Sequence, residues 1–373
     1  MIMNKYKIFY IDDEKDSLIN PIKEKLESKN ILEVTLNKPK NFESELDILT
    51  QDLKNYDALI LDLQLNGPQE DTFDENGEKF KVRYQAPPLA QMLRTLASEG
   101  SLPDMPIILC STETKIKDSF SRDFTSHDLF DWTFLKDDIN EITIKKIVSL
   151  IDGYRVINSD KKNFSHFLNR DYKELDERIL SRFVCEDNPP PHEIARTIFK
   201  DIIQPIGLLV NEVTLAARLG INISESKDWG KLCGYFSSGE YKGIFNDSWK
   251  RWWNDLVIDI FEGITSENLA SLDAVSRVTL LIEKTGLREL VVAEPIKLFE
   301  SNNYWNVCEV TGMPLDPFEG FKIIGKEEPK PWQDYAYVSL FAIVEKPKIV
   351  DKMGIKIHPT EIDRLAIERI KID

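Results

Sequence analysis

Short apolar runs alternate with amphipathic segments through the first part of the chain. Short runs bounded by polar residues are typical of fully buried parallel strands. These runs occupy residues 7–11, 31–36, 56–63, 106–110 and 132–135. Segments with apolar residues at helical spacing occupy residues 16–28, 42–54, 89–97, 115–124 and 141–151. The alternation predicts an α/β fold, with a doubly wound, parallel, five-stranded sheet that helices cover on both faces.

The pattern changes after the last helix of this series. Residues 153–162 are interpreted as a hinge, and the segments that follow predict mainly helices. Nearer the C-terminus the pattern favours short β-like runs, including 335–343 and 349–357. The predicted organisation is a first domain over 1–152, the hinge, and a mainly helical α+β domain with a small β-rich C-terminal part over 163–373.

Polar side chains of complementary types stand where four of the predicted strands end. Acidic residues end the first and third strands, hydroxyl residues follow the fourth, and a lysine follows the fifth. They are Asp12, Asp13, Asp62, Ser111, Thr112 and Lys136. The carboxyl ends of parallel strands meet at one edge of an open α/β sheet, where ligands bind. Clustered carboxylates repel one another unless a cation joins them, and their hard oxygen atoms suit Mg²⁺. The ammonium and hydroxyl groups would then hold phosphoryl oxygens.

This arrangement resembles the receiver domain of two-component response regulators. Receivers carry an acidic pair after strand one, an acceptor aspartate after strand three, a Ser or Thr after strand four and a lysine after strand five. All four elements occur here in that order, and the resemblance covers roughly residues 5–152. It implies a flavodoxin-like fold and a part in bacterial phosphorelay signalling.

The resemblance also implies a role for each matching residue. Asp62 would be the phosphoacceptor, Asp13 and Asp62 would bind Mg²⁺ directly, and Asp12 would bind it mainly through water. Ser111 would be the hydroxyl that moves toward the phosphoryl group, and Lys136 would pair with its oxygens. Phosphoryl transfer needs such positive charge around the equatorial oxygens. The implied partner is a sensor histidine kinase or another phosphodonor.

Three features depart from the receiver pattern. Lys136 is followed by Asp137 and Asp138, where receivers usually have a proline. Thr133 stands at the position of the aromatic switch residue. An insertion over 66–88 contains Asn-Gly between short apolar runs, which predicts a β-hairpin. The insertion is interpreted either as a solvated loop or as a flap or docking element.

Composition and charge limit the classes of function. The chain has 373 residues, 42% hydrophobic and 30% charged, which is typical of a globular protein of two or three domains. Its net charge of −16 argues against broad nucleic-acid binding, which needs Lys and Arg against phosphates. Neither a membrane span nor a signal peptide is predicted. The four cysteines form no C-x-x-C pair, so no zinc site or disulfide framework is predicted. We therefore expect a cytoplasmic protein.

The last predicted helix of the first domain, over 141–151, is apolar on more than one side. Ile144, Ile147, Val148 and Ile151 cannot all face one sheet, because a helix turns about 100° per residue. We therefore expect this helix to meet a second surface, provided either by the C-terminal domain or by a second copy of the protein.

The C-terminal half shows no catalytic motif and no basic recognition helix. Three tryptophans are interpreted either as a platform for stacked bases or as a buried aromatic cluster. A cysteine, an aspartate and a histidine would form a nucleophile set only if the fold brought them together. These residues are Trp249, Trp252, Trp253, Cys308, Asp316 and His358.

Three functions agree with these observations. The first is a response-regulator-like signalling protein whose receiver is phosphorylated on Asp62 with Mg²⁺ and controls a C-terminal interaction or output domain that does not bind DNA. The second is a receiver-gated enzyme or effector of a bacterial stress or phage-defence pathway. The third is an adaptor with a receiver fold that takes no phosphate.

Overall fold

The computed structural model describes residues 5–66, 72–73, 79–80, 82–118, 120, 124–160, 163–179, 189–325 and 327–371. The chain forms two compact units. The first contains Met1–Phe199 together with Lys242–Trp249, and the second contains Lys200–Tyr241 together with Lys250–Asp373. A short segment from the C-terminal half is therefore part of the first unit.

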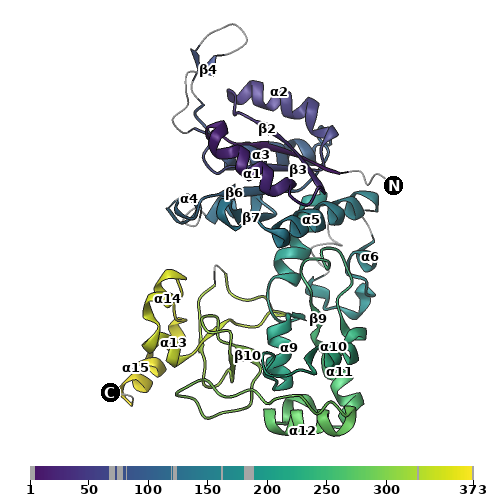
Figure 1. The fold of residues 1–373 in the computed structure, drawn as a ribbon, viewed down its shortest axis with the longest axis vertical. Coiled ribbons are helices and arrows are strands. Elements are labelled where there is room, and N and C mark those ends of the chain that lie inside the picture. Colours follow the sequence, from purple (N-terminus) through teal and green to yellow (C-terminus); the bar gives the residue numbers. More distant parts are fainter. Residues whose placement is uncertain are drawn as a thin grey trace. The chain divides into compact units, whose positions relative to one another are not determined.

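A five-stranded parallel sheet forms the centre of the first unit (Figure 1). Its strands are β1 (Tyr6–Ile11), β2 (Leu32–Asn37), β3 (Ala58–Leu61), β6 (Ile107–Ser111) and β7 (Trp132–Leu135). They lie in the order β2-β1-β3-β6-β7, and every neighbouring pair is parallel. β3 and β6 are buried along their whole length, which explains their uninterrupted apolar sequences. This order is that of a flavodoxin-like fold, so the fold predicted from the sequence is confirmed.

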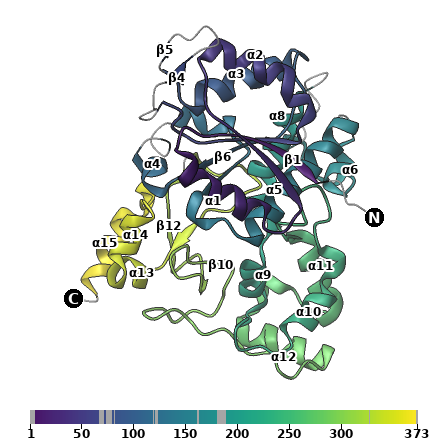
Figure 2. The same cartoon turned by 45° about the horizontal axis from the view of Figure 1, so that its top comes forward.

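Helices cover both faces of the sheet. They are α1 (Asp16–Glu27), α2 (Phe42–Asp52), α3 (Ala86–Ser98), α4 (Glu113–Asp118) and α5 (Glu141–Ser159). Leu49 of α2 and Leu89 of α3 share one hydrophobic cluster with Phe9 and Leu59 of the sheet. Figure 2 shows α2 and α3 on one side of the sheet and α1 and α5 on the other. The doubly wound arrangement is therefore confirmed.

Two short antiparallel strands form a hairpin within the insertion after β3. They are β4 (Thr72–Phe73) and β5 (Lys79–Phe80), which pair with each other. This pairing confirms the hairpin predicted from the sequence. The Asn-Gly turn at 76–77 lies outside the described residues.

Helix α5 is longer than predicted, because it continues past residue 151 to Ser159. Its first turn is stabilised by a capping box, in which the Asn140 side chain accepts hydrogen bonds from two backbone amides. Ile147 is fully buried. At Gly153 a methyl group would overlap the ring of Phe245, so only glycine permits this close approach. The residues predicted to form a hinge therefore begin within a packed helix.

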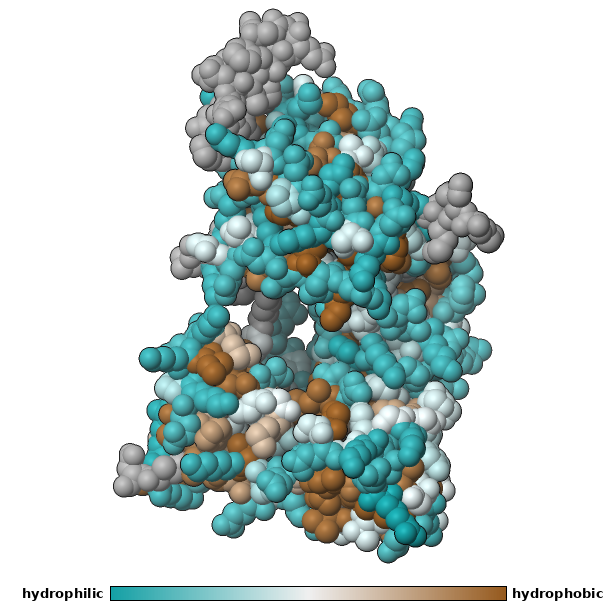
Figure 3. All heavy atoms as spheres, in the orientation of Figure 1, coloured by the Kyte–Doolittle hydropathy of each residue, from teal (hydrophilic) through white to brown (hydrophobic). Residues whose placement is uncertain are grey.

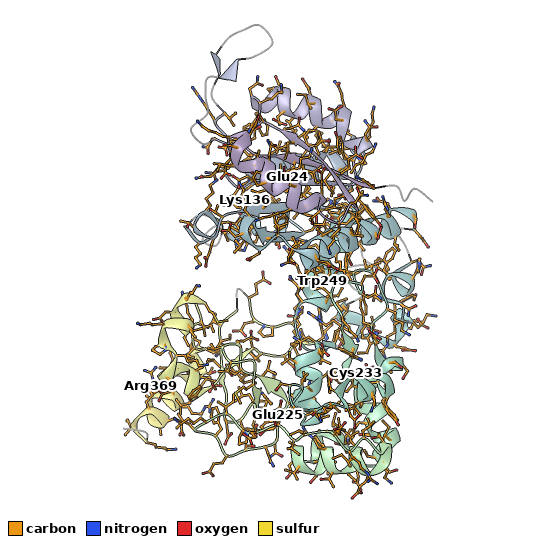
Figure 4. All side chains as sticks on the ribbon, in the orientation of Figure 1. Glu24, Lys136, Glu225, Cys233, Trp249 and Arg369 are labelled. Carbon is orange, nitrogen blue, oxygen red and sulfur yellow. The ribbon has the colours of Figure 1, made fainter. Side chains whose placement is uncertain are left out.

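The segment Lys242–Trp249 provides a second surface for α5. The indole ring of Trp249 lies edge-on to Trp132 of β7, with ring centroids 6.2 Å apart, and edge-on to Phe199 at 4.6 Å (Figure 4). The ammonium of Lys146, on α5, lies 5.2 Å from the centre of the Trp132 ring and 5.6 Å from that of Trp249. This chain therefore covers part of the apolar α5 surface itself, and self-association through α5 stays a prediction.

Short helices follow α5 in the first unit. They are α6 (Phe164–Leu168), η5 (Tyr172–Glu174) and α8 (Pro191–Arg196). Because the compact unit continues to Phe199, the domain boundaries predicted at residues 152 and 163 lie inside it. The extent of the phosphoacceptor domain therefore stays a prediction.

A closed network of buried polar side chains lies at the amino ends of β6 and β7. Arg94 of α3 donates to Asp104 at 2.9 Å and to Asp131 at 2.7 Å. The Tyr154 hydroxyl donates to the other oxygen of Asp131 at 2.7 Å. Nδ1 of His192, in α8, lies 2.6 Å from the second oxygen of Asp104. Burial opposes the charge of Arg94, but its anionic neighbours raise its pKa. This network ties α8 to the edge of the sheet.

Four helices and a two-stranded sheet share the main core of the second unit. The helices are α9 (Glu212–Leu219), α10 (Trp229–Tyr235), α11 (Asn254–Thr265) and α12 (Ala274–Thr285), and the strands are β8 (Leu209–Val210) and β9 (Trp252–Trp253).

Two antiparallel strand pairs and three helices complete this unit. They are β10 (Asn306–Val307) with β11 (Pro314–Leu315), β12 (Phe321–Lys322) with β13 (Tyr337–Val338), and α13 (Leu340–Glu345), α14 (Pro347–Lys352) and α15 (Ile362–Ile370). The mainly helical unit with a small β-rich part is as predicted. The β-like runs expected over 335–343 and 349–357 are wrong in part, since they overlap α13 and α14. Ser339 caps the first of these helices and Pro347 begins the second.

Figure 3 shows hydrophilic residues over most of the visible face of the first unit, and apolar residues gathered over α13 and α14. Ile349 and Met353, in and after α14, are 43% and 50% exposed. Among the described residues, no helix combines the length and the apolar character needed to cross a bilayer.

Candidate functional site

The predicted site residues meet at the carboxyl edge of the five-stranded sheet. Asp12 and Asp13 follow β1, Asp62 follows β3, Ser111 is the last residue of β6, and Lys136 follows β7. Parallel pairing of these strands brings their carboxyl ends together, so residues far apart in the sequence become neighbours.

Three carboxylates at this edge form a group that could hold a metal ion. Asp12, Asp13 and Asp62 each offer one oxygen, and these oxygens all lie within 4.8 Å of one another. Asp62 is fully buried and Asp12 is 2% exposed, whereas Asp13 is partly exposed. Hard oxygen donors at an edge that solvent can reach fit a hydrated Mg²⁺ ion.

Asp12 is already held by the chain itself. One of its oxygens accepts hydrogen bonds from the Tyr10 hydroxyl at 2.9 Å and lies 2.7 Å from the ammonium of Lys136. Its other oxygen accepts from the backbone amide of Glu14 at 2.9 Å. Both oxygens of Asp12 therefore have partners within the chain.

Asp62 lies between donors on both of its oxygens. The Ser111 hydroxyl donates to Oδ1 at 2.9 Å, and the Lys136 ammonium lies 3.4 Å from the same atom. Burial raises the pKa of Asp62, the charge of Lys136 lowers it, and the nearby carboxylate of Asp12 raises it again; the net shift is upward. The carboxylate is therefore desolvated and crowded by like charge.

Lys136 is the buried cation of the site (Figure 4). Only 5% of its side chain is exposed, and its ammonium also lies 3.2 Å from Glu14. Burial favours the neutral amine, but the carboxylates of Asp62 and Asp12 outweigh it and raise the pKa. The next two residues, Asp137 and Asp138, are exposed.

Two residues of the site were missed from the sequence. Glu14 directly follows the acidic pair, so its position was the signal that could have found it. Lys115 lies on α4, and its ammonium lies 2.9 Å from Oδ2 of Asp62 and 3.8 Å from Glu14. Its place in the first turn of the helix that follows β6 was the only signal, and α4 had to be placed before that signal could be read.

The hydroxyl of Thr112 accepts a hydrogen bond from the backbone amide of Lys115 at 3.4 Å. Thr133 lies within β7, between Trp132 and Phe134. Since Trp132 packs on Trp249, the aromatic side chains next to the expected switch position are placed by packing in the first unit.

The residues of the alternative sites in the C-terminal half each have other neighbours or lie in the core. Cys308 is fully buried and lies 3.3 Å from the Ser339 hydroxyl. His358 lies beside Thr360 and Glu328, and Asp316 beside Ser301. The three tryptophans proposed as a stacking platform, Trp249, Trp252 and Trp253, are at least nine-tenths buried. They are core residues.

No family model matches the chain. No curated protein matches it either.

Several solved structures are similar to part of the chain. A streptococcal protein, from a family of redox sensors that evolved from two-component response regulators, is 14% identical with a TM-score of 0.28; the match covers 41% of this chain and 54% of that one. A response regulator receiver domain protein from Clostridium thermocellum is 15% identical with a TM-score of 0.26, over 42% and 97%. The signal receiver domain of a response regulator from Mycobacterium tuberculosis is 16% identical with a TM-score of 0.25, over 40% and 98%.

This chain therefore spans about half of the first of these proteins and almost all of the other two. At these scores the similarities assign no role to any residue.

Proposed function

We propose that this chain is a response-regulator-like signalling protein in which Asp62 accepts a phosphoryl group. The observation that carries the proposal is the environment of Asp62. Its carboxylate is fully buried, receives the Ser111 hydroxyl at 2.9 Å and faces the Lys136 ammonium, with the carboxylates of Asp12 and Asp13 beside it. Three carboxylates this close repel one another, and a cation bound between them would relieve that repulsion.

The proposed reaction forms one bond and breaks one. An oxygen of the Asp62 carboxylate attacks the phosphorus of the donor, and the bond from phosphorus to the donor's leaving atom breaks, with the electron pair staying on the donor. Asp12, Asp13 and Asp62 would hold Mg²⁺, which when bound neutralises phosphoryl charge. The product is an acyl phosphate with more negative charge than the aspartate had.

Two side chains of the chain then act on the phosphoryl oxygens. Lys136 is held beside Asp62 and supplies a fixed positive charge, which stabilises the charge spread over the equatorial oxygens. Ser111 already donates to Asp62, and it would transfer this hydrogen bond to a phosphoryl oxygen. That movement shifts the end of β6 and is the proposed signal.

The donor would be a sensor histidine kinase or a small phosphodonor, and the output would pass to residues 163–373, as an interaction or effector part of the protein. The net charge of −16 argues against duplex DNA as the target. We also propose a cytoplasmic location, as for a protein that receives phosphate from a kinase.

The test is intact-protein mass spectrometry of the full chain with acetyl phosphate and Mg²⁺. We expect one added phosphate in the parent and none in Asp62→Asn. Asp57→Asn is the matched control, because Asp57 lies at the other end of β3, where it pairs with Arg155 at 2.7 Å. If the parent takes no phosphate and binds no Mg²⁺, the adaptor function becomes the better conclusion.

A further inference from the structure

A second lysine lies at the Asp62 carboxylate, outside the receiver motif. Lys115 approaches Oδ2 of Asp62 at 2.9 Å, whereas Ser111 and Lys136 face Oδ1. Each carboxylate oxygen therefore has a donor of its own. Lys115 is 22% exposed, compared with 5% for Lys136, so it is the cation with access to solvent.

Helix α4, which carries Lys115, also has an ordinary surface ion pair that serves as a comparison. Lys117 pairs with Glu113 at 2.5 Å, and the two side chains are 47% and 53% exposed. Such exposed pairs contribute little. The partner of Lys115 is different, since Asp62 has no exposed surface, and a buried carboxylate left unpaired is costly.

The six charged groups named at this site sum to a net negative charge. The carboxylates are those of Asp12, Asp13, Glu14 and Asp62, and the ammonium groups are those of Lys115 and Lys136. Together they leave two negative charges, which one Mg²⁺ would neutralise. Without Lys115 the excess would be three, so this lysine lowers the attraction of the site for a second cation.

We propose that Lys115 is a positioning residue that serves as the internal counter-ion of Asp62, and that its ammonium must leave Oδ2 when a divalent cation or a phosphoryl group engages that carboxylate. The inference rests on the proposed function of Asp62. A carboxylate that binds a metal through one oxygen and phosphorus through the other needs both oxygens, and Lys115 holds one of them.

Release of Lys115 would weaken the attachment of α4 to the sheet edge. This helix begins two residues after Ser111, and the Lys115 side chain ties it to the sheet edge through Asp62. Losing that tie loosens a six-residue helix that is too short to be stable by its own hydrogen bonds and that then depends on the packing of Ile116 against the core. Entry of a cation would thus be coupled to the order of α4.

The first test is a calorimetric Mg²⁺ titration of the full chain without any phosphodonor. Lys115→Met keeps the length of the side chain and removes its charge, and we expect it to bind Mg²⁺ about tenfold more tightly. Lys115→Arg keeps the charge and should stay within about twofold of the parent, as should the control Lys117→Met. Equal affinities for the parent and Lys115→Met would overturn the inference.

The second test is hydrogen exchange of residues 113–118. In the parent, Mg²⁺ should speed amide exchange in this segment several-fold as Lys115 is released. In Lys115→Met, exchange should be fast already and should not respond to Mg²⁺. Lys115→Arg should restore the parent's response. An identical Mg²⁺ response in the parent and Lys115→Met would contradict the proposed tie.

These outcomes separate the two proposals. A parent that shows the expected Mg²⁺ effects but takes no phosphate would contradict the function of Asp62 and leave the role of Lys115 supported. Mg²⁺ binding by Lys115→Met alone would support that role as well. If neither protein binds Mg²⁺, both proposals fail.

Discussion

Two buried groups of charged side chains lie at opposite ends of the strands β6 and β7, and they are built in opposite ways. At the amino ends, Arg94 bridges Asp104 and Asp131. Tyr154 and His192 satisfy the remaining carboxylate oxygens. Every donor and acceptor named there has its partner within the chain, so this network is closed.

At the carboxyl ends, three carboxylates meet within 4.8 Å of one another. Asp62 and Asp12 share the ammonium of Lys136, and Lys115 reaches Asp62 from a short helix. Burial and like charge raise the pKa of Asp62, whereas the pKa of Asp104 in the closed network is lowered. The difference teaches that burial alone does not mark a functional site. The stronger sign is a group of carboxylates close enough to one another to share one cation, whose mutual repulsion helps to raise a pKa.

The largest expected effect is at the closed network. Asp131→Asn removes the charge that Arg94 and Tyr154 face, and leaves a buried guanidinium with one partner fewer. We expect the free energy of unfolding to fall by about 3 to 5 kcal/mol. Asp13→Asn, at the carboxyl edge of the sheet, relieves repulsion between carboxylates. It should change the free energy of unfolding by less than about 1 kcal/mol. Urea titration measures both, and equal losses would remove the distinction between the two groups.

The next effect concerns Mg²⁺. At about 100 times its dissociation constant the ion should raise the free energy of unfolding of the parent by about 2.7 kcal/mol. Asp13→Asn should lose most of this gain, because it removes one of the three carboxylates that meet within 4.8 Å. Asp104→Asn should keep it, despite its lower starting stability. Thermal unfolding with and without Mg²⁺ measures the gain, and a gain that survives in Asp13→Asn would place the ion elsewhere.

Two tyrosines provide a matched pair of smaller changes. The Tyr154 hydroxyl donates to Asp131 at 2.7 Å, and the Tyr10 hydroxyl donates to Asp12 at 2.9 Å. Tyr154→Phe should lower the free energy of unfolding by about 2 kcal/mol, since it removes a buried hydrogen bond to a charge. Tyr10→Phe should cost about half as much, because Lys136 still pairs with the same oxygen of Asp12. The comparison fails if Tyr10→Phe costs more.

The smallest effect is on the pH dependence. Burial opposes ionisation of Asp104, but the hydrogen bond from His192 and the charge of Arg94 outweigh it and lower its pKa. The stability it contributes is therefore present above the ordinary aspartate pKa of about 4 and is lost as the pH falls through the lowered pKa. Asp62 has a raised pKa, so its contribution is present at low pH and is lost as the pH rises through that raised value.

Asp104→Asn and Asp62→Asn should thus change the pH slope of the free energy of unfolding in opposite directions. Urea unfolding between about pH 2 and pH 7 measures the slopes, because Asp104 titrates below its ordinary pKa and Asp62 above it. Slopes that change in the same direction would show that the two carboxylates do not differ as the structure indicates.

The sequence by itself determined the five-stranded sheet and most of the residues at its carboxyl edge. Strand positions follow from local apolar runs, and parallel pairing places whatever follows each strand at the same edge. Asp62, Ser111 and Lys136 could therefore be brought together without coordinates. Helix ends were less well determined, since α5 continues to Ser159 through residues whose packing on Phe245 no local pattern reveals.

The tertiary structure alone decided the contacts between segments distant in the chain. His192 meets Asp104 across 88 residues, and Trp249 packs on Trp132 although it lies in the other half of the sequence. Lys115 reaches Asp62 only because α4 starts at the end of β6 and turns its third residue inward. Residue type and spacing describe what a side chain can do, but the direction in which it points is set by the packing of the whole unit.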